Sequence, residues 1–308
     1  MYYPFLRGKR HELSALRKTA SNLDSMKVRP IIEPVKESTN TLLRTVRELN
    51  ANNINPLVII NPLVGDLVGN NSSDFFSDLI GEGLNFFPCI AFSQQNITSA
   101  CQLANHLLGD GVDFATYFRD EPTVNVSNIT SNALVNTVRA TPNLSQIFQS
   151  QIPRLVKITD SFEAQSRNAD YSTHPYVFSD AHVTYTNLPN AVGFGDYQIV
   201  GEPYTENGGP ARAVAIHITY IEPACNDLML IKHCVSTINS GTTSNTGGKF
   251  LEALGALITF ANQTPALDQT TVGFQAFIDL YNRQHYPNLG PVKENSMMHH
   301  IETISNYL

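Results

Sequence analysis

Short apolar runs alternate with amphipathic stretches along the first half of the chain. The runs at residues 28–35 and 56–62 are apolar over most of their length and contain a proline at or near their end. Residues 39–50 place apolar side chains at spacings of three and four, which predicts an amphipathic helix. The first half of the chain therefore predicts strands and helices in regular alternation.

This alternation is typical of parallel βαβ construction. The predicted strands are residues 28–35, 56–62, 86–92, 112–118 and 154–158, and the predicted helices are residues 10–22, 39–50, 75–80, 97–108 and 128–138. Continuously apolar strands are expected where both faces of a parallel sheet are covered. Right-handed crossovers leave a closed barrel or an open doubly wound sheet, and the dinucleotide-binding form of the open sheet lacks its G-x-G-x-x-G motif.

The alternation breaks after residue 160, where no helical periodicity follows as far as residue 186. The elements expected beyond this point are aromatic and polar segments at 176–178 and 182–185, a glycine-rich turn at 207–210, strands at 211–221 and 228–235, and helices at 250–260, 271–284 and 299–307. The short connection at 223–227 predicts that its two flanking strands are antiparallel.

We therefore expect an α/β fold, a TIM-barrel-like (β/α)8 architecture with an irregular, partly antiparallel second half. A single barrel-like domain is expected over residues 1–308, with residues 160–236 as an irregular, strand-rich part and residues 249–308 as C-terminal helices.

The composition fits a large folded core and argues against one class of ligand. The chain has 308 residues, 42% of them hydrophobic, and a formal net charge of -7. Because this charge has the same sign as that of nucleic acid, binding of nucleic acid over the whole surface is not expected. The dense basic cluster is Arg7, Lys9, Arg10, Arg17 and Lys18, which we interpret as a solvated helix face, with a local basic groove as the alternative.

The cysteines and the apolar runs bear on the cellular setting. Cys89, Cys101, Cys225 and Cys234 form no CxxC pair and lie in or beside apolar runs, which predicts buried free thiols rather than a zinc site. No apolar run approaches the ~18–20 residues of a membrane span, and the polar N-terminus is not typical of a signal peptide. A cytoplasmic protein without membrane contact is expected.

Several blocks resemble the beta-protein-like family of bacteria and phages. They are the opening MYYPFLRGKRHELSAL, residues 29–36, 58–66, 167–171 and 230–236, and the long block GFGDYQIVGEPYTENGGPARAVAIHITYIE at 193–222. The resemblance implies a barrel-like component of a mobile-element or anti-phage defence operon, often encoded beside a small partner gene. An operon-encoded partner protein is therefore expected, whereas the family supplies no catalytic residues.

Polar residues follow the predicted strands at their carboxyl ends, where barrel enzymes place their sites. These residues are Glu33, Lys36, Asn61, Ser93, Gln94, Arg119, Asp120, Glu121, Lys157 and Asp160. Two interpretations stay open: a shared pocket, or the ordinary polarity of strands that become loops.

Glu33 is the strongest single candidate for acid–base chemistry. It lies between Ile32 and Pro34 in an apolar strand, so burial would raise its pKa unless Lys36, Lys157 or Arg119 lies close to it. The alternative is a buried ion pair that closes the barrel.

His217 lies within the apolar strand VAIHITYI. Strand alternation places Val214, Ile216, Ile218 and Tyr220 on one face, and Ala213, Ala215, His217 and Thr219 on the other. The second face is expected to line the barrel interior or a pocket, where His217 is either a hydrogen-bonded core residue or, with Asp196 and Glu33, a ligand for a divalent metal. The pair His299–His300 is expected at the surface.

A phosphate site is the third candidate. Residues 241–249 open the helix that begins near Phe250, so backbone N–H groups and Lys249 follow Gly247 and Gly248 at a helix start. The segment is not a Walker A motif, since Thr243 replaces its first glycine and Phe250 its Ser or Thr. The alternative is a flexible loop with a glycine-rich N-cap.

Two functions from different classes follow. The first is a barrel hydrolase or lyase acting on a phosphorylated or nucleotide-like substrate. Its expected catalytic residues are Glu33, Asp196 and His217, and its expected phosphate contacts are Lys36, Asn61, Arg119, Lys157, Gly247, Gly248 and Lys249. The second is a non-catalytic scaffold that binds and regulates a partner protein, which the absence of HExxH, GxSxG and CxxC motifs favours.

Overall fold

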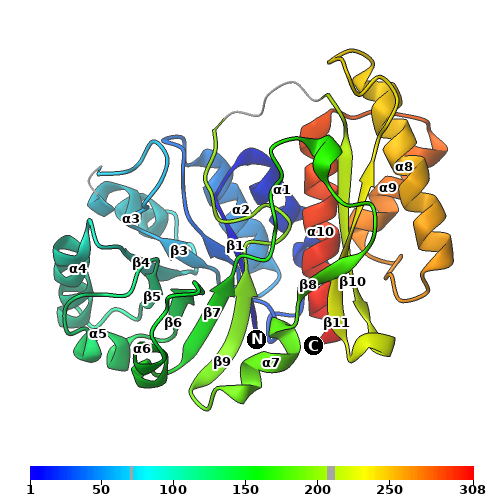
Figure 1. Ribbon diagram of the computed structural model, residues 1–308. Helices are drawn as coiled ribbons and strands as arrows, with labels where there is room; N and C mark the ends of the chain where they lie inside the picture. Colours follow the sequence, from blue (N-terminus) through cyan, green and yellow to red (C-terminus); the bar gives the residue numbers. More distant parts are fainter. Residues whose placement is uncertain (70–71, 207–211) are drawn as a thin grey trace. The chain divides into compact units, whose positions relative to one another are not determined.

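The computed structural model describes residues 1–69, 72–206 and 212–308, which form two compact units (Figure 1). Unit 1 comprises residues 1–13, 23–160 and 184–197. Unit 2 comprises residues 14–22, 161–183 and 198–308. The predicted glycine-rich turn at 207–210 lies outside the described residues.

Unit 1 contains a closed barrel of eight strands, all paired in parallel with their neighbours. In order around the barrel they are β1 (Tyr2–Leu6), β2 (Ile31–Ile32), β3 (Leu57–Ile59), β4 (Phe87–Phe92), β5 (Ala115–Phe118), β6 (Asn136–Arg139), β7 (Leu155–Thr159) and β9 (Ala191–Asp196). The predicted TIM-barrel-like fold is therefore confirmed.

Helices connect these strands and cover the outside of the barrel (Figure 1). They are α2 (Asn40–Ala51), α3 (Ser72–Gly81), α4 (Ile97–Gly109), α5 (Ser127–Asn132) and α6 (Gln146–Gln151). The helix α1 (Arg10–Thr19) follows β1 and is divided between the two units. The helix α2 buries Leu42, Val46 and Leu49 on one face, as the spacing of its apolar residues predicts.

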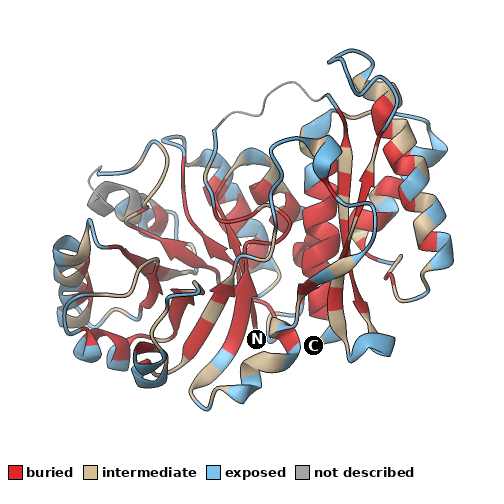
Figure 2. Ribbon diagram, viewed as in Figure 1, coloured by how far each residue is buried: buried red, intermediate tan, exposed pale blue. Residues whose placement is uncertain are grey.

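Side chains that alternate along the barrel strands form two apolar layers, so the strands are buried on both faces (Figure 2). In the inner layer, the ring of Phe5 lies 4.8 Å from that of Tyr117 and 5.0 Å from that of Tyr197. The two tyrosine hydroxyls hydrogen-bond to each other at 2.6 Å, which satisfies both polar groups inside the barrel. In the outer layer, Phe92 stacks on Phe118 beneath α4, α5 and α6.

The barrel closes where β1 pairs with β9. Gly193 and Gly195 face inward here, because a Cβ on Gly193 would overlap the carbonyl oxygen of Met1, and one on Gly195 would overlap the carbonyl oxygen of Tyr3 and the side chain of Ile158. Bare backbone at these two positions gives the first and last strands the room to approach each other.

Three barrel strands, β1, β6 and β9, are not among the predicted ones. The expected helix at 128–138 is wrong over its second half, because α5 ends at Asn132 and β6 follows. The buried side chain of Asn136 explains the strand: its Oδ1 accepts from Thr116 Oγ1 at 2.7 Å, and its Nδ2 donates to the carbonyl of Thr130 at 3.0 Å. The other two are β1, in the opening block of the chain, and β9 at Ala191–Asp196; the sequence analysis predicts no strand over either segment.

Unit 2 contains a three-stranded antiparallel sheet in the order β10–β11–β8. Its strands are β8 (Tyr176–Ser179), β10 (Ala215–Glu222) and β11 (Leu228–Val235), and its helices are α7 (Ala181–Thr184), α8 (Thr246–Gln263), α9 (Val272–Asn282) and α10 (Leu289–Tyr307). The predicted antiparallel pairing of residues 211–221 with 228–235 is confirmed for the described part of the first strand.

The predicted two-faced character of β10 is also confirmed. Ile216, Ile218 and Tyr220 pack in one apolar cluster with Phe250 of α8 and Phe274 of α9. The other face contacts α10 through Thr219, whose Oγ1 lies 2.9 Å from His300 Nδ1 and whose carbonyl oxygen lies 2.7 Å from His299 Nε2.

The C-terminal helix corrects two expectations. α10 begins at Leu289, ten residues before the predicted start at 299, and His299 and His300 are buried rather than on the surface. The apolar periodicity of α10 is weak because some of its buried residues carry carboxylates. Polar partners satisfy these carboxylates. Ser14 and Lys18 contact Glu294, and Asn22 donates to Glu302 at 2.9 Å.

All four cysteines are free thiols, as predicted, but their burial differs. Cys89 and Cys234 are buried, and burial raises the pKa of the Cys234 thiol to about 12. Cys101 is half-buried and Cys225 is exposed, so the expectation of burial is wrong for Cys225. In the part of the chain that the structure describes, no helix is long and apolar enough to span a membrane.

Gly195→Ala should destabilise unit 1 by at least about 2 kcal/mol, because the added methyl group overlaps the backbone of β1. Gly109→Ala is the control, since a Cβ on this α4 residue meets open space and alanine favours the helix. Thermal unfolding followed by circular dichroism distinguishes the two variants. Equal melting temperatures would contradict the role of the bare backbone in closing the barrel.

Candidate functional site

A cavity of about 680 Å³ lies over the carboxyl ends of β3, β4, β5 and β6 in unit 1. We call it the mouth cavity; its polar lining residues are Asn61, Ser93, Gln94, Gln95, Asn96, Ser99, Arg119, Asp120 and Arg139. Leu63, Leu67 and Leu103 supply apolar wall. Since the carboxyl ends of parallel strands meet at this face of a barrel, side chains from four successive loops converge here.

Two arginines and one aspartate set the charge of the mouth cavity. Arg139 donates through Nε to the carbonyl oxygen of Arg119 at 2.9 Å, and its Nη2 lies 3.2 Å from Asp120 Oδ1. The other oxygen of Asp120 accepts from the backbone N–H of Gln94 at 3.4 Å. Two guanidinium groups and one carboxylate therefore line the mouth cavity.

Asparagine side chains hold the wall of the mouth cavity in place. Asn61 Nδ2 donates to the carbonyl oxygen of Ala91, and the Ala91 N–H donates to Asn61 Oδ1, both at 2.8 Å. This pair of bonds imitates one more step of the β3–β4 ladder. Asn96 Oδ1 accepts from the backbone N–H of Ser93 at 2.7 Å and from its hydroxyl at 3.0 Å. These bonds hold Asn61 and Ser93 at the ends of β3 and β4 in place.

Glu33 lies beneath these loops as half of a buried ion pair. Its Oε2 accepts from Arg7 Nη1, and its Oε1 accepts from the backbone N–H of Leu63 at 2.7 Å. The Arg7 guanidinium lies over the rings of Phe5 and Tyr197, at 5.0 and 5.7 Å from their centroids. With both oxygens engaged and the side chain buried, the geometry favours the ion-pair interpretation over an acid–base role.

This pair corrects one interpretation of the sequence. Arg7 is buried directly after β1 and does not belong to a solvated helix face. The cation that pairs with Glu33 is Arg7 rather than Lys36, Lys157 or Arg119. The sequence does contain a signal for this role of Arg7. The apolar run MYYPFLR ends in a charged residue, as does the run that ends at Glu33.

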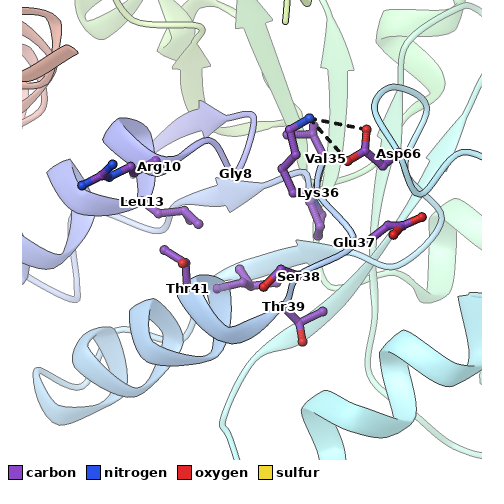
Figure 3. A pocket seen from close by; sticks show the side chains of 12 residues that line it. Gly8, Arg10, Leu13, Val35, Lys36, Glu37, Ser38, Thr39, Thr41 and Asp66 are labelled. Carbon is purple, nitrogen blue, oxygen red and sulfur yellow. Dashed lines mark hydrogen bonds and ion pairs between the residues drawn. The ribbon is translucent and has the colours of Figure 1, made fainter.

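Lys36 lines a second, smaller pocket of about 350 Å³ over the loops that follow β1 and β2 (Figure 3). Its Nζ lies 3.3 Å from Asp66 Oδ2, and both side chains are partly exposed. Arg10, Ser38 and Thr41 also line this pocket. Because Asp66 offsets the charge of Lys36, the pocket is less suited to an anion than the mouth cavity.

Lys157 and Asp196 do not line the mouth cavity. Lys157 lies between Val156 and Ile158, which belong to the inner layer, so its side chain is on the outer face of β7. Asp196 follows the inward-facing Gly195, and its Oδ1 accepts from the hydroxyl of Tyr2 at 2.7 Å. The tyrosine also stacks on Phe194, so Asp196 has a structural partner on the outer face of the barrel.

The predicted phosphate loop belongs to unit 2 and forms its own cap. Asn245 Oδ1 accepts from the backbone N–H of Gly248 at 3.2 Å, and a Cβ on Gly248 would overlap this asparagine. Lys249 is buried, and its Nζ donates to the carbonyl oxygen of Thr242 at 2.6 Å. Gly247 lies beside Tyr286. These contacts favour the glycine-rich N-cap over a phosphate site.

His217 also belongs to unit 2, so the expectation that it lines the barrel interior is wrong. Its Nδ1 lies 2.7 Å from Nδ1 of His233, the residue opposite it on β11. This contact agrees with a hydrogen-bonded core histidine. Among residues 1–69, 72–206 and 212–308, no group of three or more His, Cys, Asp or Glu side chains is arranged to hold a metal ion.

Arg139 is the residue of the mouth cavity that the sequence interpretation missed. It ends β6, which was assigned to a helix. Within LVNTVRA, Val135, Thr137 and Arg139 alternate with Asn136 and Val138, a period of two that indicates a strand. A strand assignment would have placed this arginine beside the end of β5, where Arg119 and Asp120 lie.

No family model matches the chain, and a search of curated proteins finds no significant match. The resemblance to the beta-protein-like family therefore stays a prediction. The operon setting and the partner protein stay predictions with it.

Glu33→Gln should lower the free energy of unfolding by about 3–5 kcal/mol, because it leaves the Arg7 charge buried without its carboxylate. Urea unfolding followed by circular dichroism measures the loss. Glu48→Gln, at an exposed position of α2, is the control and should be nearly neutral. A stable Glu33→Gln variant that loses ligand binding or activity would instead support the acid–base role.

Proposed function

We propose that this chain binds a phosphorylated small molecule in the mouth cavity, at the carboxyl ends of the barrel strands. The observation that carries the proposal is the convergence of Arg119 and Arg139 on one cavity of about 680 Å³. A volume of this size is within the range of small-molecule sites, which is ~300–1,000 Å³.

The guanidinium groups of Arg119 and Arg139 are suited to bind a phosphate group. A guanidinium presents several N–H donors in one plane and binds phosphate oxygens through paired hydrogen bonds. Asp120 orients Arg139, whose side chain is 23% exposed and therefore still accessible to a ligand. Partial burial strengthens the attraction relative to a fully hydrated arginine.

The rest of the lining favours a hydroxyl-bearing ligand over a nucleobase. Among the described residues that line the mouth cavity there is no aromatic ring on which a base could stack. Gln94, Gln95 and Ser99 instead offer amide and hydroxyl groups, which pair well with sugar hydroxyls. We therefore propose a sugar phosphate, or a similar polyhydroxylated phosphate monoester, as the ligand.

Binding, rather than turnover, is the activity that the geometry supports. Asp120 is the carboxylate among the described lining residues, and both of its oxygens accept hydrogen bonds. Glu33 is committed to Arg7 and to the backbone of Leu63. A general acid or base would need a carboxyl group that is available to the ligand.

Arg139→Gln and Arg119→Gln should each weaken binding of glucose 6-phosphate at least tenfold, or by about 1.4 kcal/mol, because each removes a charged phosphate donor. Isothermal titration calorimetry measures the change. Arg44→Gln, at an exposed position of α2, is the matched control and should bind as the unaltered chain does.

A comparison of glucose 6-phosphate, glucose and AMP tests the phosphate part and the sugar part of the proposal separately. Glucose should not bind measurably if the phosphate supplies most of the affinity. AMP should bind more weakly than glucose 6-phosphate, because no ring is present for its base. No binding of either phosphate, or binding unaffected by both arginine substitutions, would contradict the proposal.

A further inference from the structure

Residues 161–175 of unit 2, which we call the strap, run between the end of β7 and the start of β8. The strap carries Phe162 and Tyr171, and β8 begins directly after it at Tyr176; all three rings lie against histidines of the antiparallel sheet. Two contacts without a histidine also hold it: Asn168 Nδ2 donates to the carbonyl oxygen of Ala213 at 2.8 Å, and Lys232 Nζ donates to that of Thr173.

The histidines are His217 and His233, which lie opposite each other on β10 and β11. Their Nδ1 atoms are 2.7 Å apart, a hydrogen-bond distance. Such a contact requires one nitrogen to carry the proton and the other to accept it. Only one proton can therefore lie between the two Nδ1 atoms. If both rings were fully protonated, two N–H groups would point at each other and repel.

Tyr176 extends this contact into a chain of three groups. Its hydroxyl lies 2.9 Å from Nε2 of His233, on the side of the ring opposite Nδ1. Tyr176 thus cannot join His217 and His233 around one metal ion, and the arrangement is a hydrogen-bonded chain rather than a chelating site. The chain fixes the strap to the sheet through the protonation state of two imidazoles.

The aromatic rings of the strap pack on the same two imidazoles. Tyr171 lies 4.7 Å from the ring of His217 and 4.6 Å from that of His233, and Phe162 lies 5.0 Å from His217. These rings remove water from around the imidazoles. A buried imidazolium would lose its hydration here, and its charged neighbours include Lys232 of β11 and Lys293 of α10.

We propose that the strap is released from the sheet of unit 2 at mildly acidic pH, when the His217–His233 pair takes up protons. The rings of Phe162 and Tyr171 then separate from the imidazoles, while β8 stays paired with β11 through its backbone. The inference stands apart from ligand binding in the mouth cavity, since it concerns only residues of unit 2.

The charges around the pair give the direction of the effect. Burial, the facing His233 and Lys293 of α10 lower the pKa of His217. Burial and the adjacent Lys232 lower the pKa of His233 to about 4. Burial raises the pKa of the Tyr176 phenol, and the charges of two strap residues, Glu163 and Tyr171, raise it further.

A lowered histidine pKa means that the packed strap binds fewer protons than the released strap. The packing is therefore fully stable above the ordinary histidine pKa of ~6.5. Its stability falls as the pH drops below that value toward about 4, the pKa of packed His233. With two titrating groups, the opening constant should rise about a hundredfold or more between pH 7 and pH 5.

Hydrogen–deuterium exchange of the full chain, corrected for the intrinsic effect of pH, tests the proposal. Peptides from residues 161–175 should lose protection about a hundredfold or more between pH 7 and pH 5, whereas peptides from β4 and β11 should keep theirs. Equal protection of the strap at the two pH values would overturn the proposal, and so would a loss shared by β4 and β11.

His217→Asn assigns the effect to the pair, because the amide can still bond to His233 Nδ1 but does not titrate. In this variant the change in strap protection between the two pH values should fall to about tenfold, whatever its protection at pH 7. The control, His106→Asn at an exposed position of α4, should behave as the unaltered chain. An undiminished pH response in His217→Asn would contradict the assignment.

Discussion

The arrangement of the barrel's open face depends on the buried ion pair between Arg7 and Glu33. A carboxylate at the end of β2 lies in a region of low polarity and needs a cation within reach. Arg7, from the end of β1, supplies it while resting on the aromatic rings of the inner layer. The second oxygen of Glu33 holds the backbone of Leu63, and Leu63 is part of the mouth cavity wall. The pair thus links the ends of β1 and β2 to the wall of the mouth cavity.

The strands that the sequence predicts correctly are those with continuous apolar runs, such as β3 and β4. Their pattern follows from burial on both faces, so it can be recognised locally. β6 differs because its buried polar group, Asn136, is stabilised by partners from β5 and α5. A local pattern cannot contain that information. The helix α10 has the same property, since distant Ser14, Lys18 and Asn22 satisfy its buried carboxylates.

The candidate site could be predicted only in part. Asn61 and Arg119 follow predicted strands, so their place at the mouth of a barrel could be inferred from the sequence. Which cation pairs with Glu33 depends on β1 lying beside β2, and β1 was not predicted. The His217 contact depends on the register of two strands, which sets His233 opposite it. The resemblance to beta-protein-like proteins stays a prediction, and it concerns the operon setting of the gene rather than the candidate site.

We propose that Arg119 and Arg139 form an anion site in the mouth cavity. The most direct measurement is a crystal structure of the chain soaked in tungstate, a phosphate analogue whose metal atom is located by anomalous scattering. We expect an anomalous peak in the mouth cavity within hydrogen-bonding reach of both guanidinium groups. A peak at Lys36 or Lys249 instead, or a mouth cavity without bound anion, would contradict it.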